Sequence, residues 1–294
     1  MSDPVDLTSQ PDVPLVTALV PTYNAAAFVS ATLDSLARQT WPRLEILIGD
    51  DASTDGTVAL LESFAAAHDN VRLLRRTENL GWLRNSNDLM DHAAGEFLFF
   101  AFHDDTIAPT YVEELASVLR ERPEVVLAYS DMTVSEVGGS SEVQVFDDLS
   151  TARTPLQRGI VMAGRRKNWW VPNRGLFRAS AYRAVGGIRP NDAGEYSADW
   201  TWLLALSLRG PFARVPKVLC DKFYKPGSLS KTWPHDAAQR AALRRAGRRE
   251  VRLSPLSRPA KAVLMVHLSE WRRGWVPAPL RHLVRQAAER VVRG

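Results

Sequence analysis

Between residues 16 and 129, short apolar runs alternate with stretches whose apolar residues recur at helical spacing. The run at 16–20 predicts a buried strand, and Val29, Leu33 and Leu36 then fall on one face of a helix. The same alternation predicts further strands at 44–49, 71–74, 97–102 and 125–129, and further helices after a turn at 53–56, around 84–92 and from Pro109. Such alternation predicts an α/β fold with a mostly parallel sheet flanked by helices, because each helix forms a right-handed crossover.

Polar residues gather directly after three of the predicted strands, at 21–24, 50–51 and 103–105. The carboxyl ends of parallel strands lie at one edge of a sheet, and open α/β sheets bind their ligands in the crevice outside that edge. The sequence therefore predicts a ligand site formed by these three clusters.

The second half contains an apolar helical pattern at 202–208 and changes composition after Pro234 to an Ala- and Arg-rich helix. Two amphipathic segments follow, at 259–273 and 277–294. From Arg240 onward the chain has 14 Lys and Arg residues against three acids, a net charge of +11, whereas the preceding residues have 23 basic against 30 acidic side chains, a net charge of −7. Such asymmetry is typical of a basic segment that meets an anionic partner.

Two interpretations of the basic segment stay open. Basic amphipathic helices with Trp271 and Trp275 at their margin suit an anionic membrane surface. Alternatively the helices pack on the preceding domain with their arginines solvated, which is the usual arrangement of an amphipathic surface helix. We expect no nucleic-acid partner, because no helix-turn-helix, zinc or aromatic-rich RNA signature accompanies the charge.

The expected location is cytoplasmic, or peripheral at the inner face of the plasma membrane if the membrane interpretation holds. The N-terminal residues are acidic and lack the basic and apolar regions of a signal peptide, and the apolar run at 97–102 is far shorter than the roughly 20 residues that span a bilayer. Cys220 is the sole cysteine and cannot form an intrachain disulfide.

Asp104 and Asp105 place two adjacent carboxylates after the apolar strand at 97–102. Mg²⁺ and Mn²⁺ prefer such oxygens and usually share their coordination with substrate phosphates. The competing interpretation is a helix N-cap, since an aspartate here could begin the helix at Pro109.

Five segments bring these features into a recognisable order: 19–24 (Leu-Val-Pro-Thr-Tyr-Asn), 48–57 (Ile-Gly-Asp-Asp-Ala-Ser-Thr-Asp-Gly-Thr), 78–81 (Glu-Asn-Leu-Gly), 94–97 (Ala-Gly-Glu-Phe) and 103–105 (His-Asp-Asp). Together they resemble the inverting glycosyltransferase family 2, which has a GT-A fold. The resemblance covers roughly residues 14–232. It implies a GT-A catalytic domain over 14–232 and a basic amphipathic helical extension over 233–294.

The resemblance implies that the polar turn after the first strand and an aspartate after the second bind the nucleotide. Pro21 and Tyr23 would flank the base, with Asn24 in the same turn. Asp51 would accept a hydrogen bond from the base N–H. A carboxylate can accept from N3–H of uracil but cannot donate to the cytosine ring nitrogen, so UDP is the expected nucleotide.

By the same resemblance, Asp104 would hold the ribose, Asp105 would bind the Mg²⁺ or Mn²⁺ that bridges the diphosphate, and Lys225 would contact the diphosphate. Many relatives have Asp-x-Asp in this segment, whereas here Phe102 or His103 stands at the first position, depending on the alignment. We interpret this as a variant site.

On the acceptor side, residues 173–178 and 185–188 resemble the strand-turn-helix unit over the acceptor cleft, and Asp199 matches the aspartate that acts as general base. Relatives usually have Glu-Asp here, where this chain has Ala198 before Asp199. Glu195 is the alternative base. Asp199 could also be only an N-cap or first-turn residue of the following helix.

The expected function is transfer of a sugar from a nucleoside-diphosphate donor to an acceptor hydroxyl, on a saccharide or a lipid-linked acceptor, with inversion implied by the resemblance alone. A non-catalytic nucleotide-sugar-binding protein is one alternative. A sugar nucleotidyltransferase of similar fold is the other, but the Gly-rich, Lys- or Arg-bearing loop that such chemistry uses after the first strand is missing from residues 21–26.

Overall fold

The computed structural model describes residues 13–136, 139, 141–165, 167–224 and 232–269. Within these residues, nine strands form one sheet in the order β3-β2-β1-β4-β8-β6-β9-β5, with β7 paired to β6. The strands are β1 Val16–Thr22, β2 Leu44–Asp50, β3 Val71–Arg75, β4 Phe97–Phe100, β5 Asp105–Ile107, β6 Leu127–Glu136, β7 Glu142–Gln144, β8 Leu176–Arg178 and β9 Phe212–Tyr224. β1 to β4 run parallel, as does β6 with β9, whereas β5, β7 and β8 pair antiparallel with their neighbours.

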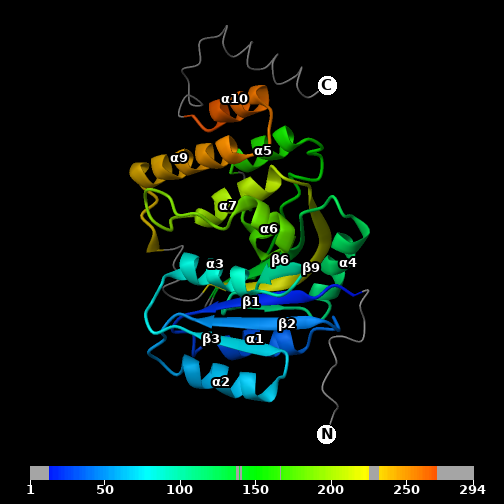
Figure 1. Cartoon of the computed structure of the whole chain (residues 1–294), viewed down its shortest axis with the longest axis vertical. Helices are drawn as coiled ribbons and strands as arrows, with labels where there is room; N and C mark the ends of the chain where they lie inside the picture. The colour runs from blue at the N-terminus through cyan, green and yellow to red at the C-terminus, as the bar shows by residue number, and fades with distance from the viewer. Residues whose placement is uncertain (1–12, 137–138, 140, 166, 225–231, 270–294) are drawn as a thin grey trace.

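Helices cover both faces of this sheet (Figure 1). They are α1 Val29–Ala37, α2 Thr57–Ala67, α3 Trp82–His92, α4 Tyr111–Glu121, α5 Pro155–Ala163, the short 3-10 helix η1 Val171–Arg174, α6 Ala179–Val185, α7 Ala198–Ser207, α9 Ala237–Leu253 and α10 Arg258–His267. The predicted α/β architecture with a helical C-terminal part is confirmed. No helix among the described residues is both long and apolar enough to cross a membrane.

The central strands form because their apolar runs are buried on both faces of the sheet. Every residue of β1 and β2 is buried, as expected for parallel strands covered by helices on either side. The predicted strand at 97–102 ends at Phe100, since a turn closed by the Asp105 N–H and the Phe102 carbonyl at 2.9 Å redirects the chain. Asp105 begins β5 rather than capping a helix, so the N-cap interpretation of this segment is wrong.

α7 lies inside the molecule rather than on its surface. All of its residues are buried except Asp199, which is only partly buried. α7 packs against α5, α6, α9 and η1 (Figure 1). A helix that is apolar all round needs cover on every side, and the C-terminal helices supply part of it.

α9 and α10 bury one face each against α5 and α7. One close approach is at Gly247 of α9, where an added Cβ would lie 2.8 Å from Cη2 of Trp200. In the same way, a Cβ on Gly159 of α5 would lie 2.7 Å from Cδ1 of Leu264 in α10. The described part of the basic segment therefore packs on the preceding domain. The amphipathic segment predicted at 277–294 lies outside the described residues, and the domain boundary at 232/233 stays a prediction.

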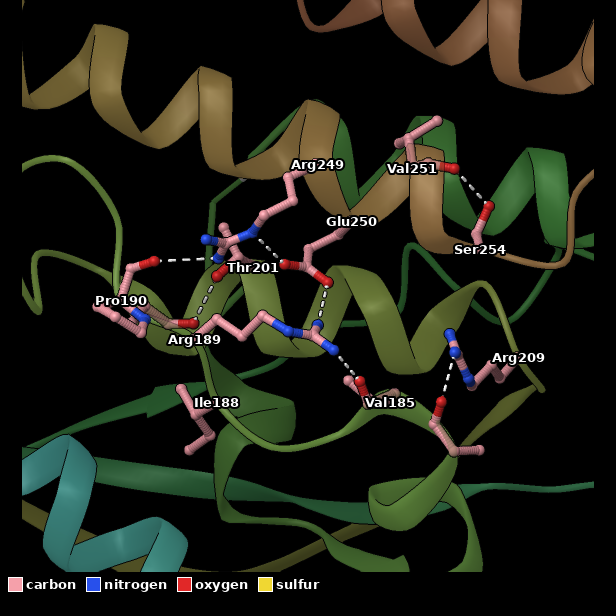
Figure 2. Close-up of polar contacts among 12 residues, drawn as sticks. Val185, Ile188, Arg189, Pro190, Thr201, Arg209, Arg249, Glu250, Val251 and Ser254 are labelled. Atoms are coloured by element: carbon pink, nitrogen blue, oxygen red, sulfur yellow. Dashed lines mark hydrogen bonds and ion pairs between the residues drawn. The ribbon is translucent and has the colours of Figure 1, made fainter.

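A charged cluster fixes α9 to the chain that follows α6 (Figure 2). The Glu250 carboxylate is buried and accepts from Nη1 of Arg189 at 2.7 Å and from Nε of Arg249 at 3.0 Å. Arg249 also donates to the Pro190 carbonyl at 3.0 Å, and Arg189 donates to the Val185 carbonyl. One buried acid thus joins α9 to the segment that leads into α7.

We expect Glu250→Gln to destabilise the protein by about 2 kcal/mol, because two partly buried arginines lose their counter-charge. The matched control is Glu62→Gln, which breaks a pair with Arg75 whose side chains are 57% and 51% exposed. Exposed pairs contribute about 1 kcal/mol or less. Urea unfolding of the full chain measures both variants, and equal losses would contradict the role assigned to Glu250.

Candidate active site

The two adjacent carboxylates lie at the carboxyl edge of the sheet, in a turn that α1 and the end of β1 hold. The Thr32 hydroxyl of α1 donates to the Asp105 carbonyl at 2.7 Å. His103 contacts the Pro21 carbonyl through Nδ1 at 3.1 Å, and since a carbonyl only accepts, Nδ1 carries the proton. This contact joins the end of β1 to the carboxylate turn, so the polar clusters predicted at 21–24 and 103–105 lie next to each other.

Asp105 is buried and paired with an arginine that the sequence did not single out. Its Oδ2 accepts from Nε of Arg174, the last residue of η1, at 2.9 Å, and the side chains are 4% and 12% exposed. The same guanidinium lies 4.4 Å from the centre of the Phe102 ring, a cation–π distance. Burial would lower the pKa of Arg174, but the charge of Asp105 and the hydrogen bond to it raise that pKa above its ordinary value.

The second oxygen of Asp105, Oδ1, is buried and has no hydrogen-bond partner among the described residues. Asp104, next along the turn, is partly buried. An ionised carboxylate with one oxygen fixed and the other unsatisfied can still take a cation. Within the described chain, however, no group of three His, Cys, Asp or Glu side chains lies close enough to hold a metal by itself.

Lys222 is a second basic residue that sequence reasoning missed. It lies opposite Asp105 in the antiparallel pairing of β5 with β9, and its Nζ lies 4.5 Å from the centre of the Tyr224 ring. Burial and the neighbouring charge of Arg174 lower the pKa of Lys222, while the charges of Asp105 and Asp104 oppose that shift. The carboxylate pair therefore has two basic neighbours: Arg174, which is paired with Asp105, and Lys222, which lies opposite Asp105 in the sheet.

Asp199 is the second residue of α7, whose N-cap residue Ser197 has a left-handed backbone with φ of 44°. Its Oδ1 accepts from the Trp200 N–H at 3.0 Å, and its Oδ2 lies 3.5 Å from Nδ2 of Asn173. Burial raises the pKa of Asp199, while the charge of Arg174, the Trp200 hydrogen bond and the charge of Arg165 lower it in part.

Two consecutive residues of η1 therefore link the predicted general base, Asp199, to the predicted metal ligand, Asp105. Asn173 contacts Asp199, and Arg174 contacts Asp105. No signal in the local sequence gives this link, because it depends on η1 lying between α7 and the carboxylate turn.

Glu195, the alternative base, lies elsewhere in the site. Its Oε1 accepts from the Leu83 N–H at the start of α3 at 3.0 Å, and a Cβ on Gly81 would lie 2.7 Å from the same oxygen. Burial raises the pKa of Glu195, the Leu83 hydrogen bond lowers it, and the charge of Asp51 raises it further. Glu195 is thus grouped with Asp51 and the start of α3.

The predicted nucleotide residues lie at the ends of β1 and β2. Asp51 is buried and accepts from the N–H groups of Leu80 at 2.7 Å and Gly81 at 2.9 Å, one on each oxygen. Pro21 is buried, and Tyr23 is 45% exposed.

The remaining turn residue, Asn24, has a left-handed backbone conformation and forms hydrogen bonds to the loop after β2. Its φ is 46°, its N–H donates to the Ser53 hydroxyl at 2.9 Å, and its Oδ1 accepts from the Thr54 N–H at 2.9 Å. Asn24 thus joins the loops after β1 and β2. Lys225 lies outside the described residues.

A mostly parallel sheet flanked by helices, with carboxylates at its carboxyl edge, is the arrangement of the nucleotide-sugar transferases of GT-A fold. The Glycosyl transferase family 2 model matches residues 17–168, more than half of the chain. The chain belongs to glycosyltransferase family 2.

Individual relatives agree with this assignment. An uncharacterized glycosyltransferase of Haemophilus influenzae is 24% identical over 230 residues, which are 78% of this chain and 71% of that protein. S. aureus TarS 1–349 in complex with UDP-GlcNAc has a similar fold, with a TM-score of 0.68 at 17% identity over 93% of this chain and 79% of that one. The mannosyltransferase PcManGT of Pyrobaculum calidifontis, in complex with GDP-Man and Mn²⁺, gives a TM-score of 0.53 at 19% identity over 95% and 81%.

Replacing Arg174 with Gln is expected to move the acidic limb of the pH–kcat/KM profile to higher pH. A base must be deprotonated to act, and burial already raises the pKa of Asp199; removing a cation that stabilises its carboxylate raises that pKa further. Arg75→Gln, at an exposed pair on β3, is the control and should leave the limb in place. An unchanged limb in Arg174→Gln would contradict the electrostatic link.

Proposed function

We propose that this glycosyltransferase moves a sugar from a UDP-sugar donor to an acceptor hydroxyl in a single displacement with inversion, assisted by Mg²⁺ or Mn²⁺. The observation that carries the proposal is the η1 link: Asn173 at 3.5 Å from Asp199, and Arg174 at 2.9 Å from Asp105. Through this link, one short helix contacts both the candidate base and the candidate diphosphate site. Both are needed for transfer, whereas a binding protein needs no base.

For the nucleotide, we propose Tyr23 and Pro21 against the base, Asp51 on the base N–H, and Asp104 on the ribose, with Asn24 holding the turn. Tyr23 presents an exposed ring. Each oxygen of Asp51 accepts one backbone N–H, and an ionised carboxylate has about four acceptor sites, so capacity for uracil N3–H is left. The TarS structure bound to UDP-GlcNAc supports a uridine donor by analogy of fold.

The residues present fit a divalent cation that completes its coordination on the donor. Asp105 would hold the ion through its unsatisfied Oδ1. Mg²⁺ commonly binds proteins through one or two carboxylates plus substrate phosphates, which is compatible with the lack of a three-ligand cluster among the described residues. When bound, the ion supplies Lewis-acid stabilisation of the diphosphate leaving group.

The chain's own cations add to that stabilisation. Arg174 keeps one oxygen of Asp105 fixed and contributes positive charge where the diphosphate leaves, and Lys222 contributes a second charge from β9. Both groups are preorganised by burial, so their effect is larger than in water. The sequence-based choice of Lys225 for this task stays a prediction.

Asp199 would remove the acceptor proton as its oxygen attacks the anomeric carbon. Burial raises the pKa of this carboxyl, which increases its affinity for that proton. The Trp200 and Asn173 contacts hold the carboxylate in place during attack. The acceptor, whether a saccharide or lipid-linked, and contact of the basic segment with an anionic membrane stay predictions.

In calorimetry, Mn²⁺ should increase the affinity of the wild type for UDP and should leave the affinity of Asp105→Asn for UDP unchanged. Asp221→Asn, an exposed aspartate on the strand that pairs with β5, is the matched control and should behave as the wild type. If UDP binds wild type equally tightly with excess chelator, the metal assignment is wrong.

Asp199→Asn should keep UDP affinity within about twofold of wild type while the transfer rate falls by on the order of 10²-fold or more. The assay is UDP release from UDP-sugars in the presence of an acceptor panel, with the exposed Asp192→Asn as control. Normal turnover by Asp199→Asn would remove Asp199 from the mechanism. The absence of acceptor-dependent release by wild type with every UDP-sugar would contradict the donor assignment.

A further inference from the structure

Arg165 lies beside the proposed base in an arrangement that the proposed mechanism does not use. It follows the C-cap of α5, and its guanidinium carbon lies 5.2 Å from the centre of the Trp169 ring and 5.6 Å from that of Trp200. Trp200 is the residue after Asp199, and its indole N–H donates to the Met162 carbonyl at 2.8 Å. The guanidinium is therefore placed by two tryptophans, one of which is itself fixed.

The donors of Arg165 are not used within the described chain. No carboxylate there lies within 4.0 Å of its guanidinium, and no hydrogen bond from that group to a described residue is formed. The two rings attract the guanidinium by cation–π contact and do not accept its hydrogen bonds through a lone pair. The N–H groups of a guanidinium form a planar fork that matches the two oxygens of a phosphate or carboxylate.

The backbone around Arg165 is held in a conformation that ordinary residues avoid. Arg165 has φ of 43°, Asn168 has 64°, and Ser197, two residues before Asp199, has 44°. Non-glycine residues in the left-handed region cost on the order of 1 kcal/mol or more each and cluster at binding and catalytic sites. Two of the three lie at or near Arg165, and the third lies two residues before Asp199.

Arg165 is also within electrostatic reach of the base. Burial raises the pKa of Asp199, and the charge of Arg165 is one of the interactions that lower it. Both Arg165 and Arg174 are partly buried, but Arg174 is paired with Asp105, whereas Arg165 forms no ion pair with a described carboxylate.

We propose that Arg165, in cation–π contact with Trp169 and Trp200, forms an acceptor subsite for an oxyanion, so that the acceptor carries a phosphate or carboxylate group near the hydroxyl that Asp199 deprotonates. The inference rests on the proposed function and specifies its acceptor class. The oxyanion fixes the acceptor against the guanidinium edge while its hydroxyl faces the base.

The test is calorimetry on the full-length protein saturated with UDP and Mn²⁺, so that a probe cannot enter the donor site. Glucose 1-phosphate, glucuronate and glucose are titrated separately. We expect one or both anionic sugars to bind and glucose to bind at least tenfold more weakly. The stronger of the two anions distinguishes a phosphate from a carboxylate acceptor.

In Arg165→Gln, the affinity for the anionic sugar should fall by about tenfold or more, as expected for loss of a charge-assisted pair. Arg165→Lys, which keeps the charge but loses the planar fork, should give an intermediate affinity. Arg75→Gln is the matched arginine control and should bind as wild type. Thermal melting of each variant reports folding.

The affinity for UDP alone, measured in the same variants, separates this proposal from the proposed function. If wild type does not bind UDP, the donor assignment fails. If UDP binds but no anionic sugar does, or if Arg165→Gln binds the anion as wild type does, or if glucose binds equally well, the oxyanion subsite is wrong while the proposed function stands.

Discussion

The ion pair between Arg174 and Asp105 is the contact on which the rest of the site depends. It joins η1 to the carboxylate turn at 2.9 Å with both side chains almost fully buried. Removal of either partner leaves an uncompensated charge in a low-dielectric environment, which is far more costly than loss of an exposed pair. The pair therefore fixes where η1 lies, and η1 in turn carries Asn173 to Asp199.

The packing of the C-terminal helices on α7 explains how the helix that carries Asp199 is held in place. Asp199 is the one residue of an otherwise buried helix that is not buried. Trp200 beside it is enclosed by α5 through the Met162 carbonyl and by α9 through Gly247. The described part of the basic segment, with α9 anchored by Glu250 (Figure 2), therefore supports the helix that carries Asp199.

Much of the fold could be predicted because the signal is local. The strands at 16–20 and 44–49 and the helix with Val29, Leu33 and Leu36 lie where the apolar periodicity predicts them. β9 could not be predicted in the same way, since Pro216 and charged residues such as Arg214 and Lys217 interrupt its apolar pattern, and its burial follows no simple alternation. It forms because β6 and β5 pair with it on either side.

The site residues, like the strands and helices, could be predicted from the sequence only where the signal is local. Asp51, Asp104, Asp105 and Asp199 could be proposed from motifs that lie next to strand ends or a helix start. Arg174 and Lys222 could not, because their significance arises only when η1 and β9 meet the carboxylate turn in space. The N-cap interpretation of the carboxylates failed for the same reason, as β5 forms only through its pairing with β9.

The central claim is that the carboxylate turn binds the donor diphosphate while Asp199 deprotonates the acceptor that attacks the same donor. A crystal structure of the full chain with UDP-sugar and Mn²⁺, with anomalous scattering to locate the ion, tests this most directly. We predict manganese at Oδ1 of Asp105, the diphosphate beside Arg174, and the anomeric carbon on the side of the sugar that faces Asp199. A donor bound with its sugar directed away from Asp199, or manganese away from the turn at 102–105, would contradict the account.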